Sequence, residues 1–509
     1  MNAIRLVKGS LAVFLGTLLS SIFAFVARVV IARGLETVQY GVLSTSLALV
    51  NVATIISMLG LNNALPREIA YWSTRRGGED EIVDEIVLTA LGIVVFSSTL
   101  IALVIALFST FIASFLRILS YAYILRLVSI VVPLLAVTET LVAVSRAYGR
   151  VTEKVLIQSI VVRMAWLIGS LIVFFLGWSL VGFILSYIIA ATIGTVLVIL
   201  SLHRAQLLPE FRIPRIRLVK DLLVFSTPLL ISNITNLVMT VTDTFMLSII
   251  NGPRAVGVYN VAAQMAKFIP ALLSATGYLA LPLFAEIYAK GALDKLKLYY
   301  KVTAKWIYVA TYPFAILLIS NPRLVIVTIF GYKYIEATSA LIVLSIGFMV
   351  HVIMGLNGIT LIALRKANAI MFITILSGFL NVLLNAVLID KYSVIGAAIA
   401  TATAYIVANI LTSAWLYRVS ELNPFTKDYL SVLLVSTIIP ATLICPLIKS
   451  IELVRVIIII ISIIATIFSA IATATEQEIA TLRHISRSPL VEKIIKILLR
   501  RIHNDFNSD

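Results

Sequence analysis

The sequence predicts an all-α polytopic membrane protein with about fourteen transmembrane helices. Of its 509 residues, 61% are hydrophobic and only 13% are charged, whereas soluble domains are about half apolar and about a quarter charged. The apolar residues come in repeated runs of about twenty, the length that crosses the hydrocarbon layer of a bilayer as a helix. The basic residues gather in alternate loops, as they do in multi-spanning proteins.

The apolar runs place predicted spans along the whole chain. The first follows a short basic segment. Because its apolar run is about 24 residues long and lacks a cleavage site of small residues, we expect an uncleaved span rather than a signal peptide. The predicted spans cover residues 10–33, 41–62, 86–108, 118–141, 155–176, 180–202, 222–250, 257–284, 303–326, 338–362, 368–389, 393–417, 428–448 and 453–474.

The distribution of charge predicts the orientation in the membrane. Of the 40 Lys and Arg residues, with those near a span end assigned to the adjoining loop, 28 belong to the N-terminus, the even-numbered loops and the tail, 8 belong to the odd-numbered loops and 4 lie deep within spans. This bias places both termini in the cytoplasm of a multi-pass cell-membrane protein. It also accounts for the net charge of +16 without a nucleic-acid partner. The single cysteine, Cys445, excludes an internal disulfide.

Two weak internal matches predict a repeat of six spans. Gly41 aligns with Gly257 at an offset of 216, and Gly182 aligns with Gly396 at an offset of 214. A six-span repeat returns to its starting side, so its halves have parallel orientation about an axis along the membrane normal. Transporters built in this way bind substrate between their halves.

The repeat leads to a predicted domain division, and we expect the protein to be a monomer. The domains are a six-helix lobe over residues 1–204, a second over 205–420, two further helices within 421–475 and a cytoplasmic basic tail over 476–509.

Four basic residues lie deep within predicted spans, where a charge is costly and usually faces a cavity or a partner. Snorkelling towards the headgroups is the alternative explanation, and it suits Arg28 best. On the eighth span, amides precede Lys267 on one helical face, a pattern that hydrogen bonds between neighbouring helices would also explain. The candidate substrate-binding residues are Arg28, Arg126, Arg163, Asn260, Gln264 and Lys267. No cluster indicates a metalloenzyme or a nucleophilic triad, so we expect a transporter rather than an enzyme.

Several short motifs resemble those of polysaccharide flippases in the multidrug/oligosaccharidyl-lipid/polysaccharide (MOP) exporter superfamily. In chain order they are Arg28 with Ala32-Arg33-Gly34-Leu35, Tyr40-Gly41, Leu59-Gly60-Leu61, Pro66-Arg67, Ser226-Thr227-Pro228, Asp243, Val256 to Asn260, Asn381 with Asn385, and Gly396 to Thr401. The resemblance covers nearly the whole chain. It implies a V-shaped cavity between two six-helix lobes and lipid-linked sugars as cargo.

The resemblance also implies a cation site and no other cofactor. In the related lipid-II flippases a sodium ion lies among the seventh, eleventh and twelfth spans, and the last two spans form a groove for the lipid tail. Where some relatives have a carboxylate, this chain has Asn385. The predicted span boundaries place these residues in one layer of the outer half of the membrane, and oxygen ligands suit a hard cation. A hydrogen-bonded helix junction is the alternative. The implied sodium ligands are Asp243, Asn381, Asn385, the carbonyl of Ala397, and Thr401.

The leading functional hypothesis is a flippase that moves polyprenyl-(di)phosphate-linked oligosaccharide from the cytoplasmic to the outer leaflet. Its phosphates would meet the basic residues within the spans. A multidrug exporter of the same superfamily is the first alternative, although such exporters tend to bind cationic drugs beside acidic residues. A membrane glycosyltransferase or polymerase acting on the same lipid carrier is the second, although the chain lacks a large external loop and an Asp-rich metal motif. The expected partners are the lipid-linked oligosaccharide and the surrounding lipids.

Overall fold

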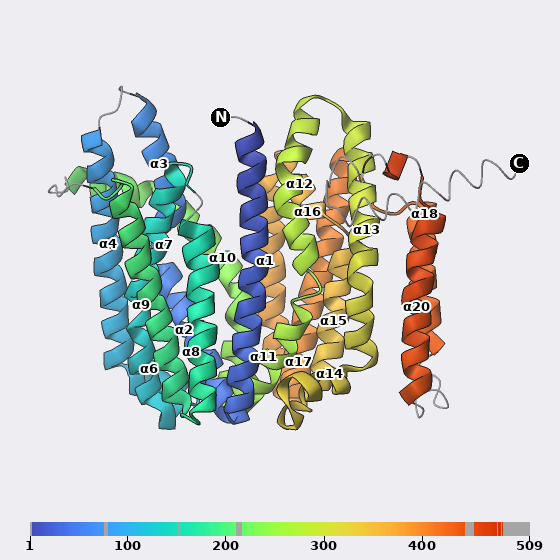
Figure 1. Cartoon of the computed structure of the whole chain (residues 1–509), viewed down its shortest axis with the longest axis horizontal. Coiled ribbons are helices and arrows are strands. Elements are labelled where there is room, and N and C mark those ends of the chain that lie inside the picture. Colours follow the sequence, from blue (N-terminus) through green and yellow to red (C-terminus); the bar gives the residue numbers. More distant parts are fainter. Residues whose placement is uncertain are drawn as a thin grey trace, which may run out of the picture. The chain divides into compact units, whose positions relative to one another are not determined.

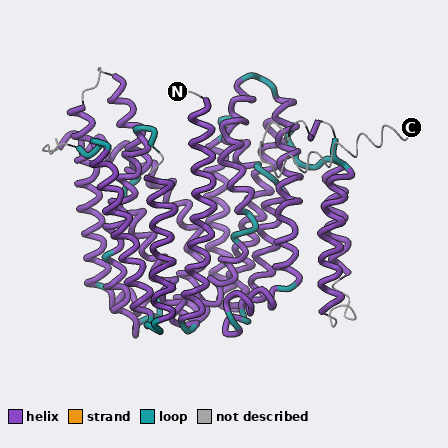
Figure 2. The backbone as a smooth tube through the Cα atoms, in the orientation of Figure 1, coloured by secondary structure: helices purple, strands orange, loops and turns teal. Residues whose placement is uncertain are grey.

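The computed structural model describes residues 3–75, 80–150, 153–209, 216–442, 452–475, 477–479 and 481. Helices make up every regular element of these residues (Figure 2). The prediction of an all-α polytopic membrane protein is confirmed, and ten of the described helices are long and apolar enough to cross a membrane. Cys445 and the basic tail beyond residue 481 lie outside the described residues.

The helices follow one another with short connections (Figure 1). In the first half of the chain they are α1 (Ala3–Gly34), α2 (Thr37–Ser57), α3 (Leu61–Arg75), α4 (Asp80–Leu107), α5 (Ser109–Phe115), η1 (Leu119–Tyr121), α6 (Ala122–Ser129), α7 (Val131–Ala147), η2 (Glu153–Val161), α8 (Val162–Phe175) and α9 (Leu180–Arg204). In the second half they are α10 (Ile216–Asn251), α11 (Pro253–Ala266), α12 (Ala271–Ala289), α13 (Leu293–Ser320), α14 (Pro322–Phe330), η3 (Tyr332–Tyr334), α15 (Ala337–Ile353), α16 (Asn357–Ala363), α17 (Ala367–Ser420), α18 (Lys427–Ala441) and α20 (Glu452–Ala472).

Several predicted spans are interrupted where the sequence disfavours a helix. The second span breaks between α2 and α3, where Leu59 and Gly60 both have positive φ. The eighth breaks between α11 and α12 just before Pro270 becomes the N-cap of α12, because proline lacks the amide hydrogen that a continuing helix needs. The eleventh and twelfth spans both lie within α17. This element is kinked between them at Ser393, whose positive φ (47°) is not helical.

The chain forms two compact units. The first contains residues 1–264, 326–337 and 378–400, and the second contains 265–325, 338–377 and 401–509. The predicted lobes follow the internal repeat rather than these units, and they stay a prediction.

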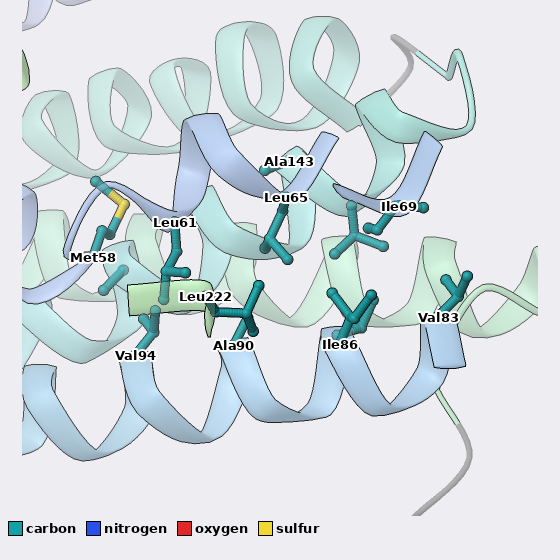
Figure 3. Close-up of a cluster of buried hydrophobic side chains, with 13 residues drawn as sticks. Met58, Leu61, Leu65, Ile69, Val83, Ile86, Ala90, Val94, Ala143 and Leu222 are labelled. Atoms are coloured by element: carbon teal, nitrogen blue, oxygen red, sulfur yellow. The ribbon is translucent and has the colours of Figure 1, made fainter. Parts of the chain in front are cut away.

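The core of the first unit is a cluster of buried aliphatic side chains from α3, α4, α7 and α10. Figure 3 shows Leu61 and Leu65 of α3 facing Ile86 and Ala90 of α4. Hydrophobic transfer contributes little to helix association within lipid, so dispersion contacts between closely fitting side chains stabilise such a cluster. It fixes α10 against the first half of the chain through Leu222.

In the second unit, α13 is joined to the last two described helices by buried polar contacts. Tyr308 Oη lies 2.5 Å from Ser436 Oγ of α18. Tyr312 Oη donates to the Ser436 carbonyl at 2.7 Å and lies 2.5 Å from Ser462 Oγ of α20. These pairs give the hydroxyl groups partners that lipid could not supply, and they fix α18 and α20 to α13.

A buried ion pair also links α13 to the segment after α20. It shows that Lys305, which the charge count assigned to a cytoplasmic loop, lies buried in a helix. Lys305 is 1% exposed within α13. Its Nζ lies 3.0 Å from Glu478 Oε2, beyond the end of α20. Burial raises the pKa of the Glu478 carboxyl, and the Lys305 ammonium opposes this by lowering it. The sequence could not show this pairing because its two partners lie so far apart along the chain.

Lys305→Ala is expected to destabilise the protein by about 3–5 kcal/mol, because it leaves Glu478 buried without its cation. The double variant Lys305→Met/Glu478→Leu removes both charges and should recover most of this loss. Thermal unfolding of the purified protein measures both effects. The control is Lys290→Ala, which breaks the exposed Lys290–Glu286 pair and should cost less than about 1 kcal/mol. Equal losses for the two lysines would refute the structural role of the buried pair.

Candidate functional site

Two arginines within the spans of the first unit lie close together. Arg28 is on α1 and Arg163 is on α8, helices that pack along each other, and both side chains are partly buried. Their guanidinium groups interact electrostatically. In the described part of the chain, neither group forms a hydrogen bond or an ion pair with a carboxylate. Two like charges of this kind favour an anion between them, because the low dielectric strengthens both their repulsion and their attraction for it.

The groups around this arginine pair are aromatic and rich in hydrogen-bond donors. Arg28 also lies near Tyr40 of α2 and Tyr187 of α9. The Tyr187 ring packs edge-on against Trp166, with the ring centroids 5.3 Å apart. Trp166 is 3% exposed, and its indole Nε1 has no acceptor among the described residues. Guanidinium and indole groups can donate but not accept hydrogen bonds, so the composition of the cluster suits an anionic ligand.

The carboxylate of Glu153, at the start of η2, already has its own partners. It accepts from Ser145 Oγ at 2.5 Å and from Ser201 Oγ at 2.8 Å. It also pairs with Arg150 at 3.0 Å. Sequence reasoning missed this residue because it precedes the predicted span, yet it is fully buried. It is therefore not available to offset the charge of the arginine pair.

Glu139 of α7 is partnered by a single neighbouring helix, η2. Its Oε1 accepts from Gln158 at 2.5 Å, and its Oε2 lies 3.8 Å from Lys154 Nζ. Both partners belong to η2, a nine-residue π-helix, and π-helical segments often occur at functional sites. The amide oxygen of Gln158 is buried without a hydrogen-bond partner among the described residues.

The other predicted substrate residues lie in different surroundings. Arg126 is exposed and donates to Ser109 Oγ at 2.8 Å and to Thr110 Oγ1 at 3.5 Å, so it binds the first turn of α5. Asn260 donates to the Val256 carbonyl of its own helix at 3.1 Å. Gln264 is half-buried at the end of the first unit, and Lys267 is exposed in the second. Their part in substrate binding stays a prediction.

Three of the predicted sodium ligands are together in the first unit. Asp243 of α10 is buried, and its Oδ1 accepts from Asn385 Nδ2 at 2.7 Å and from Asn381 Nδ2 at 3.4 Å, both from α17. Asn385 also donates to Asn381 Oδ1 at 3.0 Å. The structure thus joins the seventh span to the eleventh around one carboxylate. Ala397 is buried in the same unit, whereas Thr401 belongs to the second unit.

A tyrosine that sequence reasoning missed completes this site. The hydroxyl of Tyr259, on α11, donates to Asp243 Oδ2. Such bonds stabilise the charged form of a buried carboxylate. Asn385 Oδ1 is buried without a partner in the described part of the chain, so one more oxygen is available to bind a cation. In the structure both amides donate to Asp243, which is the hydrogen-bonded helix junction expected as the alternative. Asp243, Asn381 and Asn385 could hold a cation only with the two amide oxygens turned inward.

Comparisons with known proteins identify the family of the chain. A family model described as polysaccharide biosynthesis protein matches residues 6–288, and one described as MatE matches residues 228–389. The first match covers more than half of the chain.

Two archaeal relatives are similar in sequence. "Uncharacterized membrane protein MJ1068" of Methanocaldococcus jannaschii is 27% identical over 242 residues, 47% of each chain, so the match spans about half of that relative. "Probable low-salt glycan biosynthesis flippase Agl15" of Haloferax volcanii is 24% identical over 416 residues, 81% of this chain and 83% of that one.

Solved structures share the fold at low sequence identity. "Lipid II flippase MurJ, inward closed conformation" has a TM-score of 0.66 at 15% identity, covering 90% of this chain and 97% of its own. An inward-facing MATE-family multidrug resistance transporter has a TM-score of 0.65 at 17% identity, covering 79% and 95%. The chain therefore belongs to the polysaccharide biosynthesis protein family, within the MOP superfamily of membrane transporters.

Proposed function

We propose that the protein is a flippase that moves a polyprenyl-(di)phosphate-linked oligosaccharide from the cytoplasmic to the outer leaflet by alternating access. The observation that carries the proposal is the Arg28–Arg163 pair, which lies within the spans without a carboxylate partner among the described residues. A phosphate or diphosphate supplies the missing charge, and guanidinium groups bind it with directional hydrogen bonds. The relatives named as flippases support the same class of cargo.

The family relationship and the charge of the spans favour this cargo over the alternatives. The MatE match over residues 228–389 supports a multidrug exporter as the second candidate. A cationic drug would be repelled by the arginine pair, whereas Glu139 and Glu153 already have basic partners. The homologues with named activities are transporters, which argues against a glycosyltransferase. We further propose that both termini are cytoplasmic and that the protein is a monomer.

Binding of a defined anionic cargo tests the proposal. We expect a polyprenyl-diphosphate-linked oligosaccharide to raise the thermal unfolding midpoint of the purified protein, and a neutral glycolipid with the same sugar to leave it unchanged. Arg28→Gln and Arg163→Gln should each weaken binding by about tenfold or more, since a hydrogen bond to a charged group contributes about 1.5–3 kcal/mol. The control is Arg418→Gln, an exposed position at the end of α17. Equal binding of the neutral glycolipid would contradict the proposal.

We also propose that the site around Asp243 binds sodium and that this binding joins α10 to α17. A cation would stabilise the folded protein by about 2.7 kcal/mol when its concentration is a hundred times the Kd. Asp243→Asn should abolish this sodium-dependent rise in the unfolding midpoint and alter the fold little. Asn385→Asp, which adds a second carboxylate, should tighten binding. Asp390→Asn, at an exposed position on the same helix, is the control. A sodium effect that survives Asp243→Asn would contradict the assignment.

A further inference from the structure

Four loops from both halves of the chain meet within the first compact unit. They contain residues 33–37, 116–118, 248–253 and 328–336, and we refer to them as the outer loop cluster, because the charge bias places all four on the non-cytoplasmic side. The unit takes in residues 326–337 from the second half of the chain. The contacts inside this cluster follow the spacing that separates Gly41 from Gly257, which we refer to as the repeat offset.

The first repeated contact joins two glycines at the start of α2 and α11. A Cβ atom on Gly41 would lie 1.7 Å from the Pro253 carbonyl oxygen, and one on Gly257 would lie 2.3 Å from the Thr37 carbonyl oxygen. Pro253 follows Thr37 at the repeat offset, just as Gly257 follows Gly41. Each helix therefore offers the same backbone surface to the other, as a local two-fold axis requires.

The second repeated contact is a basic side chain on the carbonyl groups at a helix end. Lys333 Nζ donates to the carbonyls of Arg33 at 3.0 Å and Leu35 at 2.5 Å, where α1 ends. Arg117 Nη1 donates to the Ile250 carbonyl at 2.7 Å, where α10 ends. A cation at a helix C-terminus interacts favourably with the unpaired carbonyls and the helix dipole.

These two basic contacts occupy matching places in the two halves. Lys333 follows Arg117 at the repeat offset. Going back from Ile250 by the same offset leads to Gly34, which lies between the two residues whose carbonyls accept from Lys333. The two halves therefore use the same position of the repeat to bind the same helix end of the other half.

Hydroxyl groups add a third pair of such contacts. Ser248 Oγ donates to the Leu116 carbonyl at 2.6 Å, and Tyr334 Oη donates to the Ala32 carbonyl at 3.0 Å. Ser248 follows Ala32 at the repeat offset, and Tyr334 follows Leu116 at nearly the same spacing. In each half, the loop after the third span of the repeat is thus bound to the end of the first helix of the other half.

We propose that Arg117 and Lys333 are paired latches of an outer gate, which hold the outer loop cluster closed and must release their carbonyls before the protein opens to the outer side. Each latch links residues from opposite halves of the repeat, so releasing both weakens the attachment of the halves at this end, to which Arg33 also contributes by donating to the Thr328 and Ile329 carbonyls. The latches rest on the proposed function only in that a flippase has to open there, since the contacts themselves involve no cargo.

The test measures how readily a buried position beside the outer loop cluster reacts. The reporter is Val256→Cys, which is 0% exposed beside Gly257, in a chain whose native cysteine is replaced by Cys445→Ser. The probe is a hydrophilic maleimide applied to the full chain in lipid nanodiscs. Lys333→Met and Arg117→Met remove the charge of each latch while keeping much of its length. The matched control is Arg254→Met, which breaks the exposed ion pair between Arg254 and Glu336 of the same region.

We expect each latch variant to raise the labelling rate about tenfold, which corresponds to about 1.4 kcal/mol, and the double variant to raise it further. Arg254→Met should leave the rate unchanged, and Lys333→Arg and Arg117→Lys should retain slow labelling. A second reporter, Ala143→Cys in the buried core of α7, should stay unreactive in every variant. An unchanged rate in the double variant, or an equal rise at Ala143→Cys from general loosening, would overturn the proposal. If the labelling rates are as expected but the wild-type protein does not transport the anionic lipid, the proposed function is refuted and the latches are not.

Discussion

Gly41→Leu is expected to destabilise the protein at least as strongly as the loss of the buried Lys305 charge. Its Cβ would lie 1.7 Å from the Pro253 carbonyl oxygen, a backbone atom that cannot move without separating α2 from α11. Overpacking usually costs about 1–3 kcal/mol and occasionally more, and a clash with backbone belongs to the exceptional cases of about 4–5 kcal/mol or more. The measurement is the free energy of unfolding, or the thermal midpoint, of the purified protein.

The reciprocal nature of this contact gives the prediction a second part. Gly257→Leu should be similarly harmful, and the double variant should cost much less than the sum, because the first side chain already separates the helices. The control is Gly92→Ala on α4, where a Cβ meets no atom within 4 Å and alanine is the better helix former. Additive losses, or wild-type stability of Gly41→Leu, would contradict the close contact.

Removing the charges of Arg28 and Arg163 is expected to lower the transport rate strongly. The double variant Arg28→Gln/Arg163→Gln removes both positive charges near Tyr40 and Tyr187. We expect it to lower the rate of anionic-lipid flipping by about a hundredfold or more, if each charge contributes about 1.5–3 kcal/mol to holding the phosphates. The thermal midpoint without cargo should stay the same or rise, because the variant relieves repulsion between like charges.

Lysine at both positions provides a graded control for this experiment. The variant keeps the charge but loses the planar, forked geometry of guanidinium, so an intermediate rate is expected. Initial flipping rates in proteoliposomes measure all three proteins. A double glutamine variant that transports at the wild-type rate would show that the arginine pair has no part in cargo binding.

The positions of the helices could be predicted because apolar runs of span length are strong signals. Contacts between distant segments were harder to predict. Periodicity shows which face of a helix is apolar, but it does not show which other helix packs against that face. Asp243 and Asn385 were expected together only through a family resemblance. Tyr259 was missed because tyrosine in an apolar span looks like an ordinary packing residue.

The same limit explains the other corrections. Lys305 was counted with the adjoining cytoplasmic loop because it stands at the start of the predicted span 303–326, and Glu153 was missed because it precedes the predicted span 155–176. Their partners lie on other segments of the chain, which periodicity does not identify. By contrast, the repeat offset between Gly41 and Gly257 was visible in the sequence. In the structure these two glycines lie where the backbones of α2 and α11 touch, a contact that only glycine permits.

A flipping assay tests the proposed function most directly. The full chain is reconstituted with a polyprenyl-diphosphate-linked oligosaccharide, and the fraction of sugar exposed to an impermeant glycosidase is followed over time, with and without a sodium gradient. A neutral glycolipid with the same sugar is measured in parallel. We expect rapid, protein-dependent flipping of the anionic lipid that requires Arg28 and Arg163, and little flipping of the neutral one. Equal flipping of both lipids, or none of either beside transport of a cationic drug, would contradict the proposed function.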